Sequence, residues 1–240
     1  MRVQGKKQHP LITIVCCLHG DERFGKRVFD YFQKRIALYP VVKLIFANEE
    51  AYKKNKRCID QDLNRSFPGA SAGNHETKLA KKILTEVQGS RYVLDIHTTS
   101  SSIRMTPIIT HLSKPVRDLL VVSPSKEVVL MKKPFSLHPL IGQRPYGVSF
   151  EFNELFAKRK QAMNLIVRMV NQLIKSKKPK AASRWLYSVT GSIPKNKHLP
   201  KHVKNFSYCP EWKAYPFLLH ERSYPDIHAL AATKKQRITI

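Results

Sequence analysis

The stretch LITIVCCLHGDE, residues 11–22, decides the fold. Its apolar part, residues 11–18, predicts a buried strand, which places His19 at the strand's carboxyl end and Glu22 in the following turn. A second apolar run, residues 92–96, predicts another strand, which ends at His97. Open α/β sheets place their sites where neighbouring strands end. We therefore expect these three side chains to meet at one edge of a sheet.

The three side chains are a typical ligand set for a catalytic metal. Two imidazoles and one carboxylate hold zinc in sites that keep a fourth position open for water. An HxxE pair alone recurs by chance, so the prediction of a metal site depends largely on the addition of His97. The sequence thus predicts one Zn²⁺ per chain, held by His19, Glu22 and His97. Asp95 should lie on the same side of the strand as His97 and orient a ligand imidazole, or else pair with basic surface residues.

Hydrophobic periodicity elsewhere predicts alternating strands and helices. Together these segments indicate an α/β fold, a mixed central sheet flanked by helices, with a small β-rich C-terminal unit. We expect a catalytic domain over residues 1–176 and a small β-rich domain over 177–240, separated by a basic linker at 176–180. The expected helices are 25–38, 76–87 and 153–174, with Leu155 on the buried face of the last; the expected strands are 41–46, 105–110, 128–131, 148–152, 185–189 and 214–220, and residues 48–73 are expected to form a long ordered loop.

Length and composition exclude several classes of protein. A chain of 240 residues with 42% hydrophobic content can bury a substantial core. No apolar run approaches the roughly 20 residues that span a bilayer, and the N-terminus does not resemble a signal peptide, which predicts a cytoplasmic protein without a membrane contact. None of the four cysteines forms a CxxC pair, so reduced and mostly buried thiols are expected.

The formal charge of +26 raises the possibility of a nucleic-acid partner. The basic residues are dispersed, however, and no recognisable nucleic-acid module accompanies them. A solvated basic surface explains the composition better than a nucleic-acid interface does. A positive field also concentrates small anions around a cleft, which favours an acidic substrate.

The polar segment RCIDQDLNRSFPG, residues 57–69, extends the pattern. HGDE at 19–22, this segment, LDIHTTS at 94–100 and Glu151 occur in the order seen in the succinylglutamate desuccinylase and aspartoacylase family, zinc carboxypeptidase-like amidohydrolases that the chain resembles over most of its length. The resemblance implies a zinc carboxypeptidase-like catalytic domain, zinc bound by His19, Glu22 and His97, and hydrolysis of the amide bond of a small anionic N-acyl amino acid.

The resemblance also implies roles for other residues. Glu151 matches the family's general base, and it lies in a buried strand pattern where a lone carboxylate is costly unless it is paired or functional. Glu154 is the nearest alternative. Matching positions assign oxyanion stabilisation to Arg57, the grip on the substrate's α-carboxylate to Asn64 and Arg65, and a substrate contact to Tyr224.

The chain departs from the family at two positions. Aspartoacylases carry a specificity arginine ten residues before the catalytic glutamate, and Ile141 stands there instead. Arg144 could substitute for it, aided by Tyr146. Asn153 occupies a position where family members commonly have glycine.

Two other functions stay open on the sequence. A metallocarboxypeptidase could use Arg65 to hold the terminal carboxylate of a short peptide. A basic protein with a vestigial metal site could bind a polyanion through its surface charge. The acyl group, the amino acid and the oligomeric state are left open.

Overall fold

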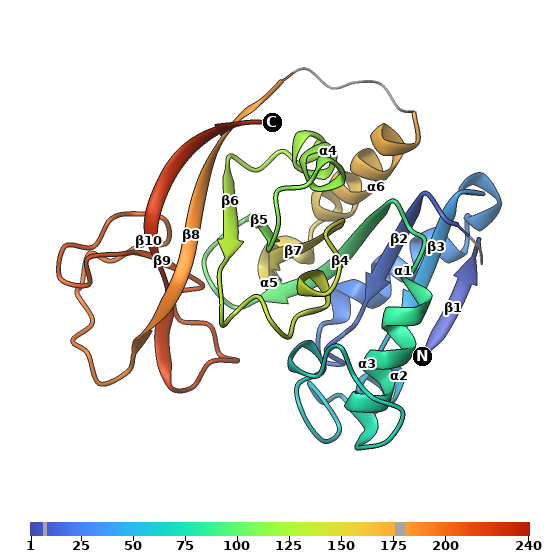
Figure 1. The fold of residues 1–240 in the computed structure, drawn as a ribbon, viewed down its shortest axis with the longest axis horizontal. Coiled ribbons are helices and arrows are strands. Elements are labelled where there is room, and N and C mark those ends of the chain that lie inside the picture. Colours follow the sequence, from blue (N-terminus) through green and yellow to red (C-terminus); the bar gives the residue numbers. More distant parts are fainter. Residues whose placement is uncertain (7–8, 176–180) are drawn as a thin grey trace.

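The computed structural model describes residues 1–6, 9–175 and 181–240. Its strands form one ten-stranded sheet in the order β1-β3-β2-β4-β7-β5-β6-β8-β10-β9, with helices around its N-terminal part (Figure 1). The mixed α/β architecture predicted from the sequence is therefore confirmed. The predicted linker at 176–180 lies outside the described residues.

The elements have the following bounds. The strands are β1 Arg2–Gly5, β2 Ile12–Cys16, β3 Val42–Phe46, β4 Tyr92–Thr99, β5 Met105–Ile109, β6 Glu127–Met131, β7 Gly147–Asn153, β8 Ser183–Pro194, β9 Tyr215–Phe217 and β10 Ile227–Thr239. The α-helices are α1 Arg23–Gln33, α2 Glu49–Lys53, α3 His75–Glu86, α4 Lys114–Val122, α5 Glu154–Ala157 and α6 Lys160–Ile174. Three short 3-10 helices are η1 Ile36–Leu38, η2 Leu63–Arg65 and η3 Leu140–Gly142.

Four parallel strands, β3, β2, β4 and β7, form the part of the sheet that carries the site. Successive side chains of a strand point to opposite faces, and both faces are covered here. On one face, Ile12 and Ile14 of β2 belong to a buried cluster with apolar residues of α1, α4 and α6. On the other face, Val15 packs with Ile83 of α3. Burial on both faces explains why these strands are mostly apolar in the sequence.

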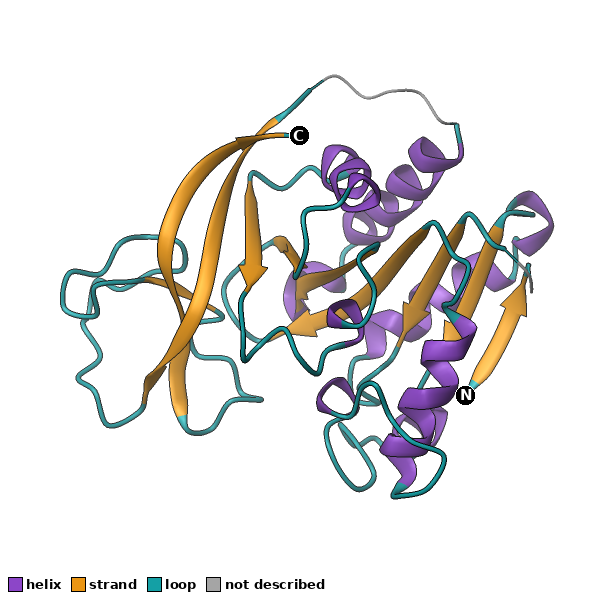
Figure 2. Ribbon diagram, viewed as in Figure 1, coloured by secondary structure: helices purple, strands orange, loops and turns teal. Residues whose placement is uncertain are grey.

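Strands and loops make up the C-terminal part of the chain (Figure 2). β8 pairs in parallel with β6, and β10 pairs antiparallel with both β8 and β9, so these strands extend the central sheet. Their apolar side chains form two further buried clusters, one of which includes Ile108 and Ile141. The division into domains 1–176 and 177–240 stays a prediction.

The helix predicted over 153–174 is two helices. α5 ends at Ala157 and α6 begins at Lys160, and Leu155, expected on the buried face, is 68% exposed. Asn153 explains the start of α5, because its side-chain oxygen accepts hydrogen bonds from the backbone N–H groups of Leu155 and Phe156. The asparagine at this family glycine position therefore ends β7 and caps the following helix.

Other boundaries also differ from the prediction. β4 continues past His97 to Thr99, and the expected loop at 48–73 contains α2 and η2. Sequence patterns did not reveal β1, α4 or β10, and residues 185–189 are only the middle of a longer strand. The last seven residues of β10, TKKQRIT, are mostly charged or polar, because much of this half of the strand faces solvent while it pairs with β8.

Within the described ranges 1–6, 9–175 and 181–240, no helix has both the length and the apolar character needed to cross a bilayer.

Candidate metal centre and catalytic site

His19, Glu22 and His97 meet at the carboxyl edge of the sheet. His19 Nδ1 lies 2.6 Å from Glu22 Oε1, and His97 Nδ1 lies 3.2 Å from Glu22 Oε2. One ligand atom from each residue lies within 4.8 Å of the other two, and all three side chains are buried. The chain reaches this arrangement because β2 and β4 are parallel neighbours, which brings the segment after β2 beside the end of β4.

The Nε2 atom of each imidazole contacts a further carboxylate. Asp95 Oδ2 lies 2.8 Å from His97 Nε2, as the strand alternation predicted, and it also accepts a 2.7 Å hydrogen bond from Ser149 Oγ. Asp62 Oδ1 lies 3.1 Å from His19 Nε2. Each carboxylate can therefore hold its imidazole with Nδ1 facing Glu22.

The charges of the cluster fit a metal cation. Burial alone would lower the pKa of His97, but Asp95 and Glu22 outweigh it and raise that pKa well above its usual value. Burial would likewise raise the pKa of Glu22, yet the two imidazoles hold it well below the ordinary range. Neutral imidazole nitrogens, a carboxylate and the two supporting carboxylates are the donor chemistry of a zinc site.

Glu151 lies beside this cluster. It is the Cα partner of His97 across the parallel pair β4 and β7, so the two side chains lie on the same face of the sheet. Burial raises the pKa of Glu151 to about 8, although His97 opposes the shift. The side chain borders a small cavity together with His19 and Glu22. A carboxyl group in such a position can accept and return a proton close to the cluster.

Glu154, the alternative base, lies elsewhere. It follows β7 at the start of α5, and its carboxylate oxygens accept hydrogen bonds of 2.6 and 2.7 Å from Arg222. It does not border the cavity that Glu151 shares with His19 and Glu22. The geometry favours Glu151.

Arg57 lies between the cluster and solvent. Its Nη2 donates to Asp62 Oδ2 at 2.9 Å, and its Nη1 lies 3.7 Å from Glu22 Oε1. Nη1 also donates to Ser223 Oγ at 3.2 Å. These contacts fix the guanidinium at the wall of the cavity next to Glu22, where it can stabilise negative charge that develops on a substrate oxygen.

Asn64, Arg65 and Tyr224 also line this cavity. Arg65 Nη2 donates to the Tyr224 hydroxyl at 3.3 Å, which joins η2 to the C-terminal segment. Asn64 Oδ1 accepts from the Leu140 N–H at 3.1 Å, which leaves its amide nitrogen free to donate. The structure thus brings together nine of the ten predicted site residues around one cavity or directly behind it.

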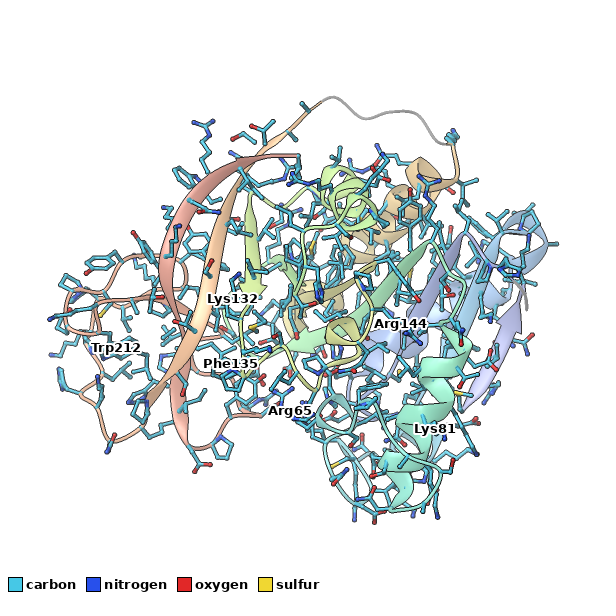
Figure 3. The ribbon with its side chains drawn as sticks, in the orientation of Figure 1. Arg65, Lys81, Lys132, Phe135, Arg144 and Trp212 are labelled. Atoms are coloured by element: carbon cyan, nitrogen blue, oxygen red, sulfur yellow. The ribbon has the colours of Figure 1, made fainter. Side chains whose placement is uncertain are left out.

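Arg144 is the predicted residue that the structure does not bring to the site. It lies before the amino end of β7, whereas Glu151 lies near the carboxyl end, and it borders none of the described cavities that contain Glu151. Figure 3 shows Arg144 apart from Arg65 and Phe135. Arg144 therefore does not line either of these two cavities.

Glu221 is a site residue that sequence reasoning missed. Its carboxylate accepts hydrogen bonds from the Thr99 hydroxyl, from the Ser100 N–H at 2.9 Å and from the Ser223 N–H at 3.0 Å. These bonds join the C-terminal segment to the end of β4 and so place Tyr224 at the cavity. No spacing could indicate the contacts with Thr99 and Ser100, because these residues lie more than 100 positions before Glu221.

Glu76 is a second missed residue, and it organises the loop that carries Arg57 and Arg65. Its buried carboxylate accepts hydrogen bonds of 2.7, 2.9 and 3.3 Å from the backbone N–H groups of residues 59, 60 and 61, and one of 2.9 Å from Asn48 Nδ2. Burial alone would raise the pKa of Glu76, but these donors outweigh it and lower the pKa. The ionised carboxylate of Glu76 thus accepts the hydrogen bonds that the backbone N–H groups of residues 59, 60 and 61 would otherwise make with water.

Glu76→Gln should destabilise the fold. The glutamine NH2 would face backbone donors, and we expect a loss of about 1 to 3 kcal/mol in the free energy of unfolding, measured by urea unfolding at pH 7. Because folding lowers the pKa of Glu76, its contribution is present at neutral pH and is lost as the pH falls. The difference from the parent protein should therefore shrink in acid. Equal effects of Glu76→Gln and Glu86→Gln, a half-exposed carboxylate on the same helix, would contradict this account.

Asp62 is the third missed residue, although its motif was recognised. Asp62→Asn keeps the shape of the side chain and its bond to the Asn64 N–H, but it removes the charge beside His19. We expect zinc affinity to fall by about 10- to 100-fold, as is usual when a residue that hydrogen-bonds to a metal ligand is replaced. Competition with a chromogenic chelator measures this affinity. Asp60→Asn, in the same loop, is the matched control, and an equal loss in both variants would remove Asp62 from this role.

Comparison with known proteins shows which proteins the chain is similar to. Residues 8–120, slightly less than half of the chain, match the model of the succinylglutamate desuccinylase/aspartoacylase catalytic domain. A probable aspartoacylase from Acaryochloris marina is 32% identical over 114 aligned residues, and the match covers 42% of this chain and 38% of that protein. The family resemblance is confirmed. The match thus spans well under half the length of this curated relative.

Solved structures share the fold across the whole chain. Murine aminoacylase 3 superposes with a TM-score of 0.78 at 16% sequence identity, covering 98% of both chains. The succinylglutamate desuccinylase from Chromobacterium violaceum gives a TM-score of 0.72 at 18% identity, covering 97% of this chain and 86% of the other. At these identities the likeness concerns the fold, and it confirms the predicted architecture.

Proposed function

We propose that this protein is a zinc-dependent amidohydrolase that cleaves the amide bond of an N-acyl amino acid. The observation that carries the proposal is the cluster of His19, Glu22 and His97 beside Glu151. The cavity next to this cluster is lined by Glu151, Arg57 and Arg65. Membership of residues 8–120 in this catalytic-domain family supports the same chemistry.

His19, Glu22 and His97 would hold the zinc ion, and Asp62 and Asp95 would keep the two imidazoles oriented. When bound, zinc supplies a Lewis acid that polarises the amide carbonyl and makes a water molecule more acidic. Glu151 takes a proton from the attacking water and later delivers it to the leaving amine. Arg57 donates to the carbonyl oxygen as that oxygen gains negative charge.

Substrate recognition falls to Arg65, Asn64 and Tyr224. The Arg65 guanidinium pairs with the α-carboxylate of the amino acid, and the Asn64 amide adds a donor beside it. The Tyr224 hydroxyl, which now accepts from Arg65, lies where it can contact the same end of the substrate. Glu221 and Glu76 act through position alone, because they hold the segments that carry these side chains.

A substrate panel tests the proposal. Zinc-replete protein is given N-acetyl, N-formyl and N-succinyl amino acids beside short peptides that end in the same residues, and the products are read by mass. We expect cleavage of the N-acyl amino acids and its loss on chelation. Exclusive cleavage of the peptides would instead indicate a carboxypeptidase, and binding of polyanions that a chelator leaves unchanged, without any cleavage, would indicate a basic binding protein.

A further inference from the structure

An apolar chamber of about 310 Å³ opens beside Glu151. Most of its lining side chains are hydrophobic and come from β5, β6, η3 and the C-terminal strands; the apolar lining residues are Ile108, Met131, Phe135, Pro139, Ile141, Leu218, Ile227 and Leu230. Phe135 is labelled close to Arg65 in Figure 3. Ligand pockets combine such an apolar lining with a few polar groups that fix orientation.

The polar groups lie at the end of the chamber nearest the metal centre. Arg65, Asn64, Tyr224 and Glu151 border both this chamber and the small cavity that contains His19 and Glu22. Ser149 also borders the chamber, but its hydroxyl already donates to Asp95. The chamber therefore lies directly beside the catalytic cavity.

The described residues that line the chamber include no second cation that could pair with a further acidic group. Among the described residues that line it, Arg65 is the one cation, and the proposed function already assigns that guanidinium to the α-carboxylate. Ile141, 2% exposed, forms part of the apolar wall. Its carbonyl accepts a 2.8 Å hydrogen bond from Thr110 Oγ1, which fixes the backbone there. A carboxylate that entered the chamber would lose its hydration without gaining an ion pair in exchange.

The position of the chamber decides which part of the substrate enters it. The α-carboxylate and the amide nitrogen are bonded to the same Cα atom, so pairing with Arg65 while the amide lies near Glu151 places this Cα atom between the two residues. The side chain of the amino acid is the remaining substituent. Because Arg65 and Glu151 both border the chamber, the side chain points into it.

We infer that the chamber receives the side chain of a large apolar amino acid, so that the substrates are N-acyl derivatives of residues such as phenylalanine, leucine and methionine rather than of aspartate or glutamate. This inference rests on the proposed function. The volume is ample, since an apolar cavity of about 150 Å³ already binds benzene.

Initial rates on N-acetyl derivatives of phenylalanine, leucine, alanine, aspartate and glutamate test the inference. We expect kcat/KM for N-acetylphenylalanine to exceed that for N-acetylaspartate by at least about 10-fold. The reverse preference would overturn the inference and leave the proposed function standing. N-hexanoylaspartate belongs in the same panel, and a preference for it over N-acetylphenylalanine would also overturn the inference, because the acyl chain would then occupy the chamber.

Two variants change the chamber in different ways. Ile141→Arg should lower kcat/KM for N-acetylphenylalanine by at least about 10-fold and shift the preference toward N-acetylaspartate. Met131→Phe narrows the chamber with an apolar residue, which cores tolerate better, and should shift the preference from N-acetylphenylalanine toward N-acetylalanine. Leu155→Arg, on an exposed position, is the control and should leave both ratios unchanged. Unchanged ratios in a folded Met131→Phe variant would contradict the inference even if Ile141→Arg fails to fold.

Binding of free amino acids separates this inference from the proposed function. Calorimetry with the zinc-replete protein should show that L-phenylalanine binds more tightly than L-aspartate and that Met131→Phe weakens its binding. If this pattern holds while no N-acyl amino acid is cleaved, the chamber assignment stands and the proposed function fails. Equal binding of the two amino acids would contradict the chamber assignment.

Discussion

Glu151→Gln should retain zinc and lose turnover. The substitution keeps the size and polarity of the side chain but removes the group that accepts and returns a proton, and general acid–base catalysis typically contributes about 10²- to 10⁴-fold to the rate. We expect kcat to fall within this range, measured as the rate of amine release from the preferred N-acyl amino acid. Metal content, determined by elemental analysis of the same preparation, should stay near one zinc per chain.

Glu154→Gln is the matched control for this experiment. Glu154 lies three residues further along the chain and pairs with Arg222, so its loss should change kcat little. Full activity in Glu151→Gln together with a strong loss in Glu154→Gln would transfer the role of base to Glu154. Loss of zinc from Glu151→Gln would show that this carboxylate serves the metal instead.

Glu22→Gln should abolish stoichiometric zinc binding. Glu22 provides the negative ligand of the set and lies within hydrogen-bonding distance of both imidazoles and of the Thr98 N–H, so its neutral replacement removes the charge on which the ligand geometry depends. Loss of a residue that hydrogen-bonds to a metal ligand lowers metal affinity by about 10- to 100-fold. We expect loss of the ligand itself to lower zinc affinity further. Equilibrium dialysis against zinc measures the change.

Asp21→Asn provides the comparison for Glu22→Gln. Asp21 is the neighbouring carboxylate, but it is exposed and is not part of the ligand cluster. It should bind zinc as the parent protein does. If Glu22→Gln binds zinc as tightly as Asp21→Asn, the metal centre assigned to His19, Glu22 and His97 is wrong.

Local sequence patterns predicted much of the site. Apolar runs located β2 and β4, and strand ends then placed His19 beside His97. Alternation along a strand predicted that Asp95 lies on the same side as His97, and the 2.8 Å contact between them agrees. These predictions succeeded because each depends on backbone geometry over a few residues.

Contacts between distant segments could not be predicted in this way. Glu221 and Glu76 are single carboxylates without a motif of their own, and their partners become visible only when the chain has folded. Arg144 lies only three residues from Ile141, yet Ile141 borders the chamber and Arg144 does not, and no local pattern distinguishes the two positions. Leu155 was expected to be buried because the break between α5 and α6 at Lys158 and Arg159 carries no proline or glycine signal.

The central claim is that zinc at one site per chain makes this protein an amidohydrolase. Metal-stripped protein is titrated with Zn²⁺ while amine release from a mixture of N-acetyl amino acids is followed by mass. The account predicts no release without zinc and a linear rise that ends at one equivalent per chain. Release that continues in the stripped protein, or its complete absence at every zinc concentration, would contradict the account.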